Sequence, residues 1–147
     1  MTRVLAIDPG AERVGIALSD PLGVIAQPHG SVPARPPETL VSRLAALALD
    51  LEADQLVVGL PYRLDGREGP EAKAARRLAA ALRQATRRPV ALVDERMTSV
   101  AAERALLEGG RRGARRKALS DQVAAALILQ TYLSSGSRAK PRSEEDD

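Results

Sequence analysis

The first 26 residues contain three short apolar runs separated by tight turns, and this arrangement constrains the fold more than any other feature of the sequence. Residues 4–7 and 14–18 are rich in Val, Leu, Ile and Ala, and an Asp-Pro pair with a nearby glycine follows each run. Proline presets φ and glycine accepts positive φ, which is typical of turns. A third run begins at Val24. Three short strands joined by such turns predict an antiparallel meander.

The remainder of the chain alternates between helix and strand patterns. Leucines at helical spacing and β-branched runs follow one another without a long linker. A meander followed by this alternation predicts an α/β fold, a mixed sheet with helices on its faces. The expected elements are helices over 38–51, 71–87, from Thr98 or Ser99 to Glu108, and from about Asp121 to Leu133 with Ser120 as its cap, and strands over 55–60 and 90–93.

The composition favours one domain with an aliphatic core. The chain has 147 residues, no Phe and no Trp, and the abundant alanines allow close approach of the elements. Residues 1–134 are expected to form this domain, and the polar, charged residues 135–147 are expected to be disordered. No signal peptide and no run long enough to cross a membrane is visible, which predicts a soluble, cytoplasmic protein.

Basic residues are clustered rather than spread evenly. The net charge is only +3, from 22 Lys and Arg against 19 Asp and Glu, but the last four residues are all acidic. Clustered arginine is the footprint of a phosphate-rich partner, although a solvated basic face explains it about equally well. The densest cluster consists of Arg111, Arg112, Arg115, Arg116 and Lys117.

Three places in the sequence bring carboxylates to positions where chemistry is possible. Asp8 ends the first strand, and Asp94 and Glu95 follow the last one, so they share an edge if the two strands are parallel. Successive side chains of a strand point to opposite faces, so Asp94 and Glu95 do not both aim at one point without a bend. Asp121 opens an apolar, buried helix and shares a face with Ala125. A turn aspartate and two acids near helix starts remain the structural alternatives.

The candidate ligands restrict the kind of metal. The chain has no cysteine, and its single His29 lies in a Pro/Gly-rich stretch. Carboxylates without His or Cys prefer hard cations such as Mg²⁺ or Mn²⁺. Two ions about 3.5–4 Å apart can clamp the attacking and leaving oxygens of an in-line displacement at phosphorus.

Four motifs, read together, resemble the YqgF family of pre-16S rRNA nucleases and Holliday-junction-resolvase-like nucleases. The resemblance covers residues 4–133, nearly the whole chain. Related junction resolvases carry a carboxylate after the fourth strand, whereas Gly59-Leu60-Pro61 stands there in this chain. The matching segments are residues 6–20, which include Arg13; residues 57–66; residues 93–99, which include Arg96; and residues 121–133.

The resemblance implies an RNase H-like fold with a five-stranded mixed sheet of order 3-2-1-4-5 and helices on both faces. It also implies that Asp8, Glu95 and Asp121 are catalytic and bind Mg²⁺ or Mn²⁺, with two ions expected, while Asp94 orients the strand end. The substrate would be pre-rRNA, at the 5′ end of pre-16S rRNA, or branched DNA, and the protein a monomer or homodimer. The expected nucleic-acid contacts are Arg13, Arg96, Arg111, Arg112, Arg115, Arg116 and Lys117.

Two other functions compete with the nuclease. Sugar kinases and actin-like ATPases share a related fold, but they need a second subdomain for which this chain is too short. A non-catalytic nucleic-acid-binding or ribosome-assembly module would tolerate Asp8→Asn, whereas a nuclease would not. With only two aromatic residues, recognition by base stacking is nearly excluded.

Overall fold

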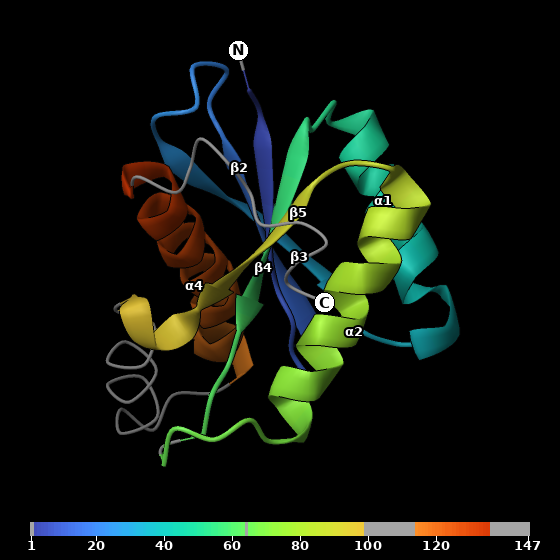
Figure 1. Cartoon of the computed structure of the whole chain (residues 1–147), viewed down its shortest axis with the longest axis vertical. Helices are drawn as coiled ribbons and strands as arrows, with labels where there is room; N and C mark the ends of the chain where they lie inside the picture. The colour runs from blue at the N-terminus through green and yellow to red at the C-terminus, as the bar shows by residue number, and fades with distance from the viewer. Residues whose placement is uncertain (1, 64, 99–113, 136–147) are drawn as a thin grey trace.

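A single mixed sheet organises the chain (Figure 1). The computed structural model describes residues 2–63, 65–98 and 114–135. The strand order is β3-β2-β1-β4-β5, with β1, β4 and β5 parallel to one another and β2 antiparallel to both β1 and β3. The predicted class and strand order are therefore confirmed. The strands are β1 (Val4–Asp8), β2 (Arg13–Ser19), β3 (Ala26–Pro33), β4 (Gln55–Leu60) and β5 (Val90–Asp94).

Helices cover both faces of this sheet, as Figure 1 shows. On one face lie α1 (Leu40–Asp50) and α2 (Pro70–Thr86), and on the other lies α4 (Ala114–Ser134). Because successive side chains of a strand point to opposite faces, the core is divided into two parts, one on each face of the sheet. In β1, for example, Leu5 and Ile7 pack with α1 and α2, while Val4 and Ala6 pack with α4.

In the structure, β3 and α1 begin later in the sequence than predicted. Val24 and Ile25 precede β3 because the Asp20 carboxylate accepts both of their N–H groups, at 2.7 and 2.9 Å, and holds them in a turn. The Pro/Gly-rich stretch that contains His29 forms part of β3, which is an edge strand, and His29 itself is exposed. The first helical turn after Pro36 is the 3₁₀ turn η1 (Pro37–Thr39), so α1 begins only at Leu40.

The last helix begins earlier than predicted and is less buried. It starts at Ala114 and passes through Ser120, which is therefore not its cap, because the Ala, Arg, Lys and Leu residues of this stretch all favour helix. Its inner face, which includes Ala125 and Ile128, is buried, but Val123 is 37% exposed. Asp121 consequently lies about two turns inside α4. Stabilisation of an acid by a helix N-terminus therefore does not explain an aspartate at this position.

Two further predictions fall outside the described residues. They are the helix expected between residues 98 and 108 and the disordered tail of residues 135–147, of which only Ser135 is described. Among the described residues, no helix combines the length and the apolar character that a membrane span requires.

Candidate active site

Two acidic side chains meet at the edge where the parallel strands end. Asp8 is the last residue of β1, and Glu95 follows β5 as the first residue of the 3₁₀ turn η2 (Glu95–Met97). Glu95 is in phase with Val93, which packs on the α4 side, just as Asp8 is in phase with Ala6. Both carboxylates therefore point to the α4 face, where Asp8 is 2% and Glu95 7% exposed.

The two carboxylates converge on Gly59 of β4. A Cβ atom at Gly59 would lie 3.2 Å from Oε2 of Glu95 and 3.6 Å from Oδ1 of Asp8, so the two oxygens are no further apart than the sum of these distances. The same Cβ would lie 2.6 Å from Cδ1 of Ile128 on α4. Glycine thus provides the room in which a strand, a turn and a helix come together.

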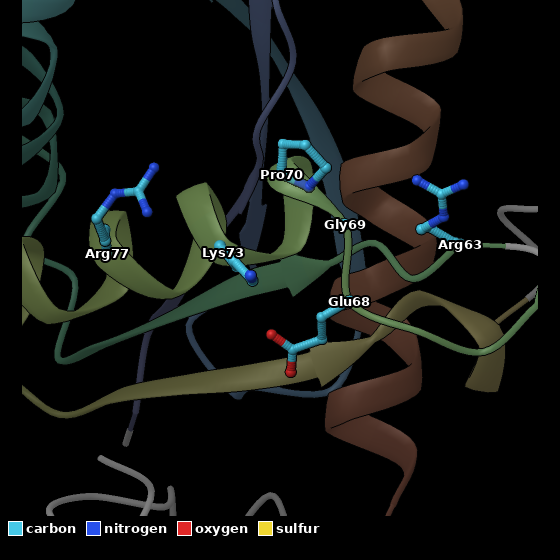
Figure 2. A pocket seen from close by; sticks show the side chains of 6 residues that line it. All are labelled: Arg63, Glu68, Gly69, Pro70, Lys73 and Arg77. Atoms are coloured by element: carbon cyan, nitrogen blue, oxygen red, sulfur yellow. The ribbon is translucent and has the colours of Figure 1, made fainter.

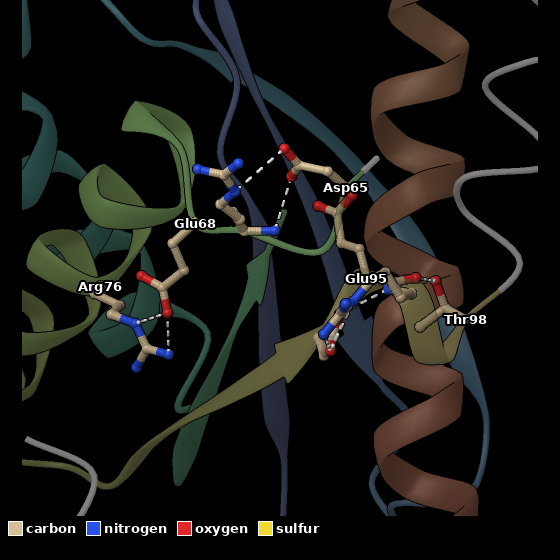
Figure 3. A network of polar contacts seen from close by, with 8 residues as sticks. Asp65, Glu68, Arg76, Glu95 and Thr98 are labelled. Carbon is tan, nitrogen blue, oxygen red and sulfur yellow. Dashed lines mark hydrogen bonds and ion pairs between the residues drawn. The ribbon is translucent and has the colours of Figure 1, made fainter. Parts of the chain in front are cut away.

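Asp94 points the other way and holds the turn that carries Glu95. Its carboxylate accepts the backbone N–H of Arg96 at 2.9 Å and binds the guanidinium of that residue at 2.8 Å. Partial burial would raise the pKa of Asp94, but the bonds from Arg96 outweigh it and hold this pKa below its ordinary value. At the end of the turn, the Thr98 hydroxyl donates to the Glu95 carbonyl at 2.7 Å (Figure 3).

Arg96 also connects this turn to the loop that follows β4. Its guanidinium carbon lies 4.0 Å from the centre of the Tyr62 ring, a cation–π contact. A Cβ at Gly66 would lie 3.4 Å from Nη1 of Arg96, so the loop passes closely over the guanidinium. The side chain predicted to contact nucleic acid is thus engaged by Asp94 and Tyr62, although it is half exposed.

Asp121 reaches the same face from α4. A Cβ at Gly15 would overlap the main-chain carbonyl group of Asp121, so only glycine lets α4 lie so close to β2. Gly15 is in turn the register partner of Asp8 on β1. The Asp121 carboxylate pairs with Nε of Arg13 at 3.6 Å, and the two side chains are 22% and 39% exposed.

The donors fit a hard divalent cation. Oδ1 of Asp8 and Oε2 of Glu95 are buried, and no hydrogen bond within the described residues reaches these two atoms, while both residues make other polar interactions. Carboxylate oxygens are the ligands that Mg²⁺ and Mn²⁺ prefer. Within the described residues, no group of three His, Cys, Asp or Glu side chains is arranged to hold one ion, and the Asp121 carboxylate pairs with Arg13. The structure therefore brings two of the three predicted ligands together.

The remaining predicted contacts are only partly described. Arg111 and Arg112 fall outside the described residues, and for Arg115, Arg116 and Lys117 at the start of α4 only the backbone is described. Asp20, a further acid of the first motif, lies at the opposite end of β2, near Leu18, which pairs with Leu5. The pKa of Asp20 is lowered by the N–H groups of Ile25 and Val24, which is the signature of a turn rather than of a ligand.

Three residues that matter for this geometry were not predicted from the sequence. Gly59 and Gly15 lie inside strands, where glycine often marks the close approach of another element, and this signal was available. Tyr62 follows β4 with no pattern that predicts its contact with Arg96. Its role depends on the position of a turn more than 30 residues away.

A 3-2-1-4-5 mixed sheet with carboxylates at the ends of β1 and β5 places the chain in the class of RNase H-like proteins. Residues 2–135 match the family described as "RuvX: Holliday junction resolvase". The chain belongs to this family, RuvX/YqgF, which its motifs resemble.

Individual relatives agree with this assignment. Proteins named "Putative pre-16S rRNA nuclease" are similar along their length: one from Chloroflexus aurantiacus is 42% identical over 97% of this chain and 93% of its own. Another from Thermobifida fusca is 45% identical over 92% and 89%. Among solved structures, Thermus thermophilus RuvC in complex with a Holliday junction substrate aligns with a TM-score of 0.57 over 97% of this chain and 99% of that one. At 15% identity, this likeness concerns the fold.

Proposed function

We propose that the protein is a metal-dependent nuclease that hydrolyses phosphodiester bonds in pre-16S rRNA, at its 5′ end. The observation that carries this proposal is the convergence of the Asp8 and Glu95 carboxylates on Gly59 at the carboxyl edge of the sheet. Open α/β sheets bind ligands at this edge. The names of the full-length relatives supply the substrate, and a protein acting on pre-rRNA would work in the cytoplasm.

Asp8 and Glu95 would hold the cation. The third candidate ligand is Asp121, whose main chain packs against Gly15, the register partner of Asp8. A bound Mg²⁺ or Mn²⁺ would supply Lewis-acid chemistry, polarising the phosphate and activating water for in-line attack. The chain's own part is to fix the carboxylates. Asp94 caps η2, and the absence of a side chain at Gly59, called here the Gly59 gap, lets the two carboxylates approach each other. Arg13, which pairs with Asp121, would contact a substrate phosphate.

A second candidate function, the cutting of branched DNA, is favoured by the description of the family as Holliday junction resolvases. Both functions use the same carboxylates and differ only in the nucleic acid that reaches them. Symmetric resolution of a junction requires two active sites, and hence a homodimer. A monomer in solution would therefore favour the RNA substrate.

The test is a cleavage assay on labelled single-stranded RNA, a pre-16S rRNA 5′ end, duplex DNA and a four-way junction, each in Mg²⁺, in Mn²⁺ and in EDTA. Wild type is compared with Asp8→Asn and with the control Asp50→Asn, which removes an exposed carboxylate from the end of α1. We expect metal-dependent cleavage that Asp8→Asn abolishes and Asp50→Asn retains. Equal nucleic-acid binding by all three proteins without any cleavage would leave the non-catalytic assembly module as the function.

A further inference from the structure

An open pocket of about 400 Å³ lies where α2 begins, beside the loop that follows β4 (Figure 2). It plays no part in holding the carboxylate pair. Three of the six lining residues are basic and exposed, and this composition suits the binding of an anion. The lining residues are Arg63, Glu68, Gly69, Pro70, Lys73 and Arg77.

The one acid among these six residues is compensated from outside the pocket. Oε2 of Glu68 binds Arg76 through Nε at 2.8 Å and through Nη2 at 2.6 Å (Figure 3). This hydrogen bond to Arg76 keeps the pKa of Glu68 below its ordinary value, so the ion pair is present at neutral pH. Arg76 does not line the pocket. Nε of Arg63 lies 3.9 Å from Oδ1 of the half-exposed Asp65, and Lys73 also acts electrostatically on Glu68. The three lining cations still outnumber the one lining acid, so the pocket keeps a positive charge.

The three cations come from two elements that are fixed relative to each other. Lys73 and Arg77 are four residues apart on α2 and so share one side of the helix. Arg63 belongs to the loop, and its side-chain stem crosses the start of α2: a Cβ at Gly69 would lie 3.0 Å from its Cδ. The loop is closed by the Gly66 N–H bonding to the Arg63 carbonyl at 2.8 Å.

The pocket and the carboxylate pair lie at the same edge of the sheet. The loop and α2 follow the carboxyl end of β4, which is parallel to β1 and β5. The pocket lies on the α2 side of this edge and the carboxylates on the α4 side. The contact of Tyr62 in the loop with Arg96 in η2 joins the two regions. A polymer that crosses the edge would touch both.

We infer that this pocket binds a backbone phosphate of the nucleic-acid substrate, away from the bond that is cut. The inference rests on the proposed function, since it takes the substrate to be a phosphodiester polymer. Except for the ring of Pro70, the described residues that line the pocket offer no aromatic or large apolar surface on which a base could stack, so a lone nucleotide would gain little there. Exposed Lys and Arg in an open pocket suit backbone phosphate, which positions a strand without reading its sequence.

The test compares two charge-matched double variants. Lys73→Gln/Arg77→Gln removes two pocket cations. The control Arg87→Gln/Arg88→Gln removes two cations that follow the other end of α2 and precede β5, at the opposite edge of the sheet. Affinity for labelled single-stranded RNA and for DNA of the same sequence is measured in EDTA at several salt concentrations. The slope of log K against log salt falls by about 0.7 for each lost contact with a single strand.

We expect the slope of the pocket variant to fall by about 0.7 on both nucleic acids, because the contact with one phosphate is lost, while the slope of the control variant stays at the wild-type value. Equal slopes for the two variants would overturn the inference. The wild-type cleavage assay separates this outcome from failure of the nuclease: cleavage with equal slopes refutes the pocket alone, and a reduced slope without any cleavage refutes the nuclease alone.

Discussion

Replacing Gly59 with alanine should disturb packing and the carboxylates at once, and a second substitution can separate the two effects. The new Cβ would lie 2.6 Å from Cδ1 of Ile128, where carbon atoms prefer about 3.5–4.0 Å. Ile128 is fully buried between α4 and the sheet, so its side chain has little room to move away. Overpacking of this kind costs about 1–3 kcal/mol of unfolding free energy.

Ile128→Val removes Cδ1, the atom that the new Cβ meets. Alone, it should cost about 0.5–1.5 kcal/mol through the lost methyl group. In the double variant Gly59→Ala/Ile128→Val the clash is gone, so the double variant should be more stable than the sum of the single effects predicts, by roughly 1 kcal/mol. Urea unfolding of the four proteins measures this coupling.

Cleavage should respond differently from stability. In the double variant the alanine Cβ still lies 3.2 Å from Oε2 of Glu95 and 3.6 Å from Oδ1 of Asp8, inside the space on which both carboxylates converge. We therefore expect Mn²⁺ affinity, measured by calorimetry, and cleavage to stay low although stability recovers. Additive stability effects would refute the contact with Ile128. Full recovery of Mn²⁺ binding in the double variant would refute the role of the Gly59 gap.

Three other substitutions test the surroundings of this pair. Gly15→Ala would drive a Cβ into the main-chain carbonyl of Asp121, which cannot rotate away as a side chain can, so we expect a loss of about 3 kcal/mol or more in urea unfolding; an unchanged midpoint would contradict it. Arg13→Gln should change stability by less than about 1 kcal/mol, because its ion pair is partly exposed, yet lower the salt slope of nucleic-acid binding by about 0.7. Arg96→Gln should raise the pKa of Asp94 toward its ordinary value, as an NMR titration would show. In wild type this lowered pKa contributes stability above the unfolded-state pKa that is lost as the pH falls through the folded-state value, and the variant should lose this acid-side dependence.

Much of the fold followed from patterns that need no tertiary information. The short apolar runs and the Asp-Pro turns predicted the meander, and residues 55–60 form β4 as expected. The predicted boundaries were wrong where a single side chain or a run of helix-forming residues determines where an element begins. The Asp20 carboxylate draws Val24 and Ile25 into a turn, and the stretch from Ala114 extends the last helix. Neither effect changes the periodicity on which the predictions relied.

The site was predictable in part for the same reason. The parallel order of β1 and β5 brings Asp8 and Glu95 to one edge, and the phase of Val93 decides that Glu95, not Asp94, faces α4. What the sequence alone left open was the distance between α4 and the sheet. That distance depends on Gly15 and Gly59, and only a three-dimensional arrangement shows what each glycine faces.

The same close approach leaves no room for an acidic side chain at position 59, near the end of β4. An acidic side chain at position 59 would begin at a Cβ that is already 2.6 Å from Ile128 and 3.2 Å from the Glu95 carboxylate. It would therefore meet a packed helix and a like charge before it could bind a cation. Glu95, which follows β5, extends its carboxylate beside Gly59 instead, and the turn that Asp94 caps holds it there. In this chain β4 contributes room rather than a ligand, and α4 lies close enough to bring Asp121 to the same face.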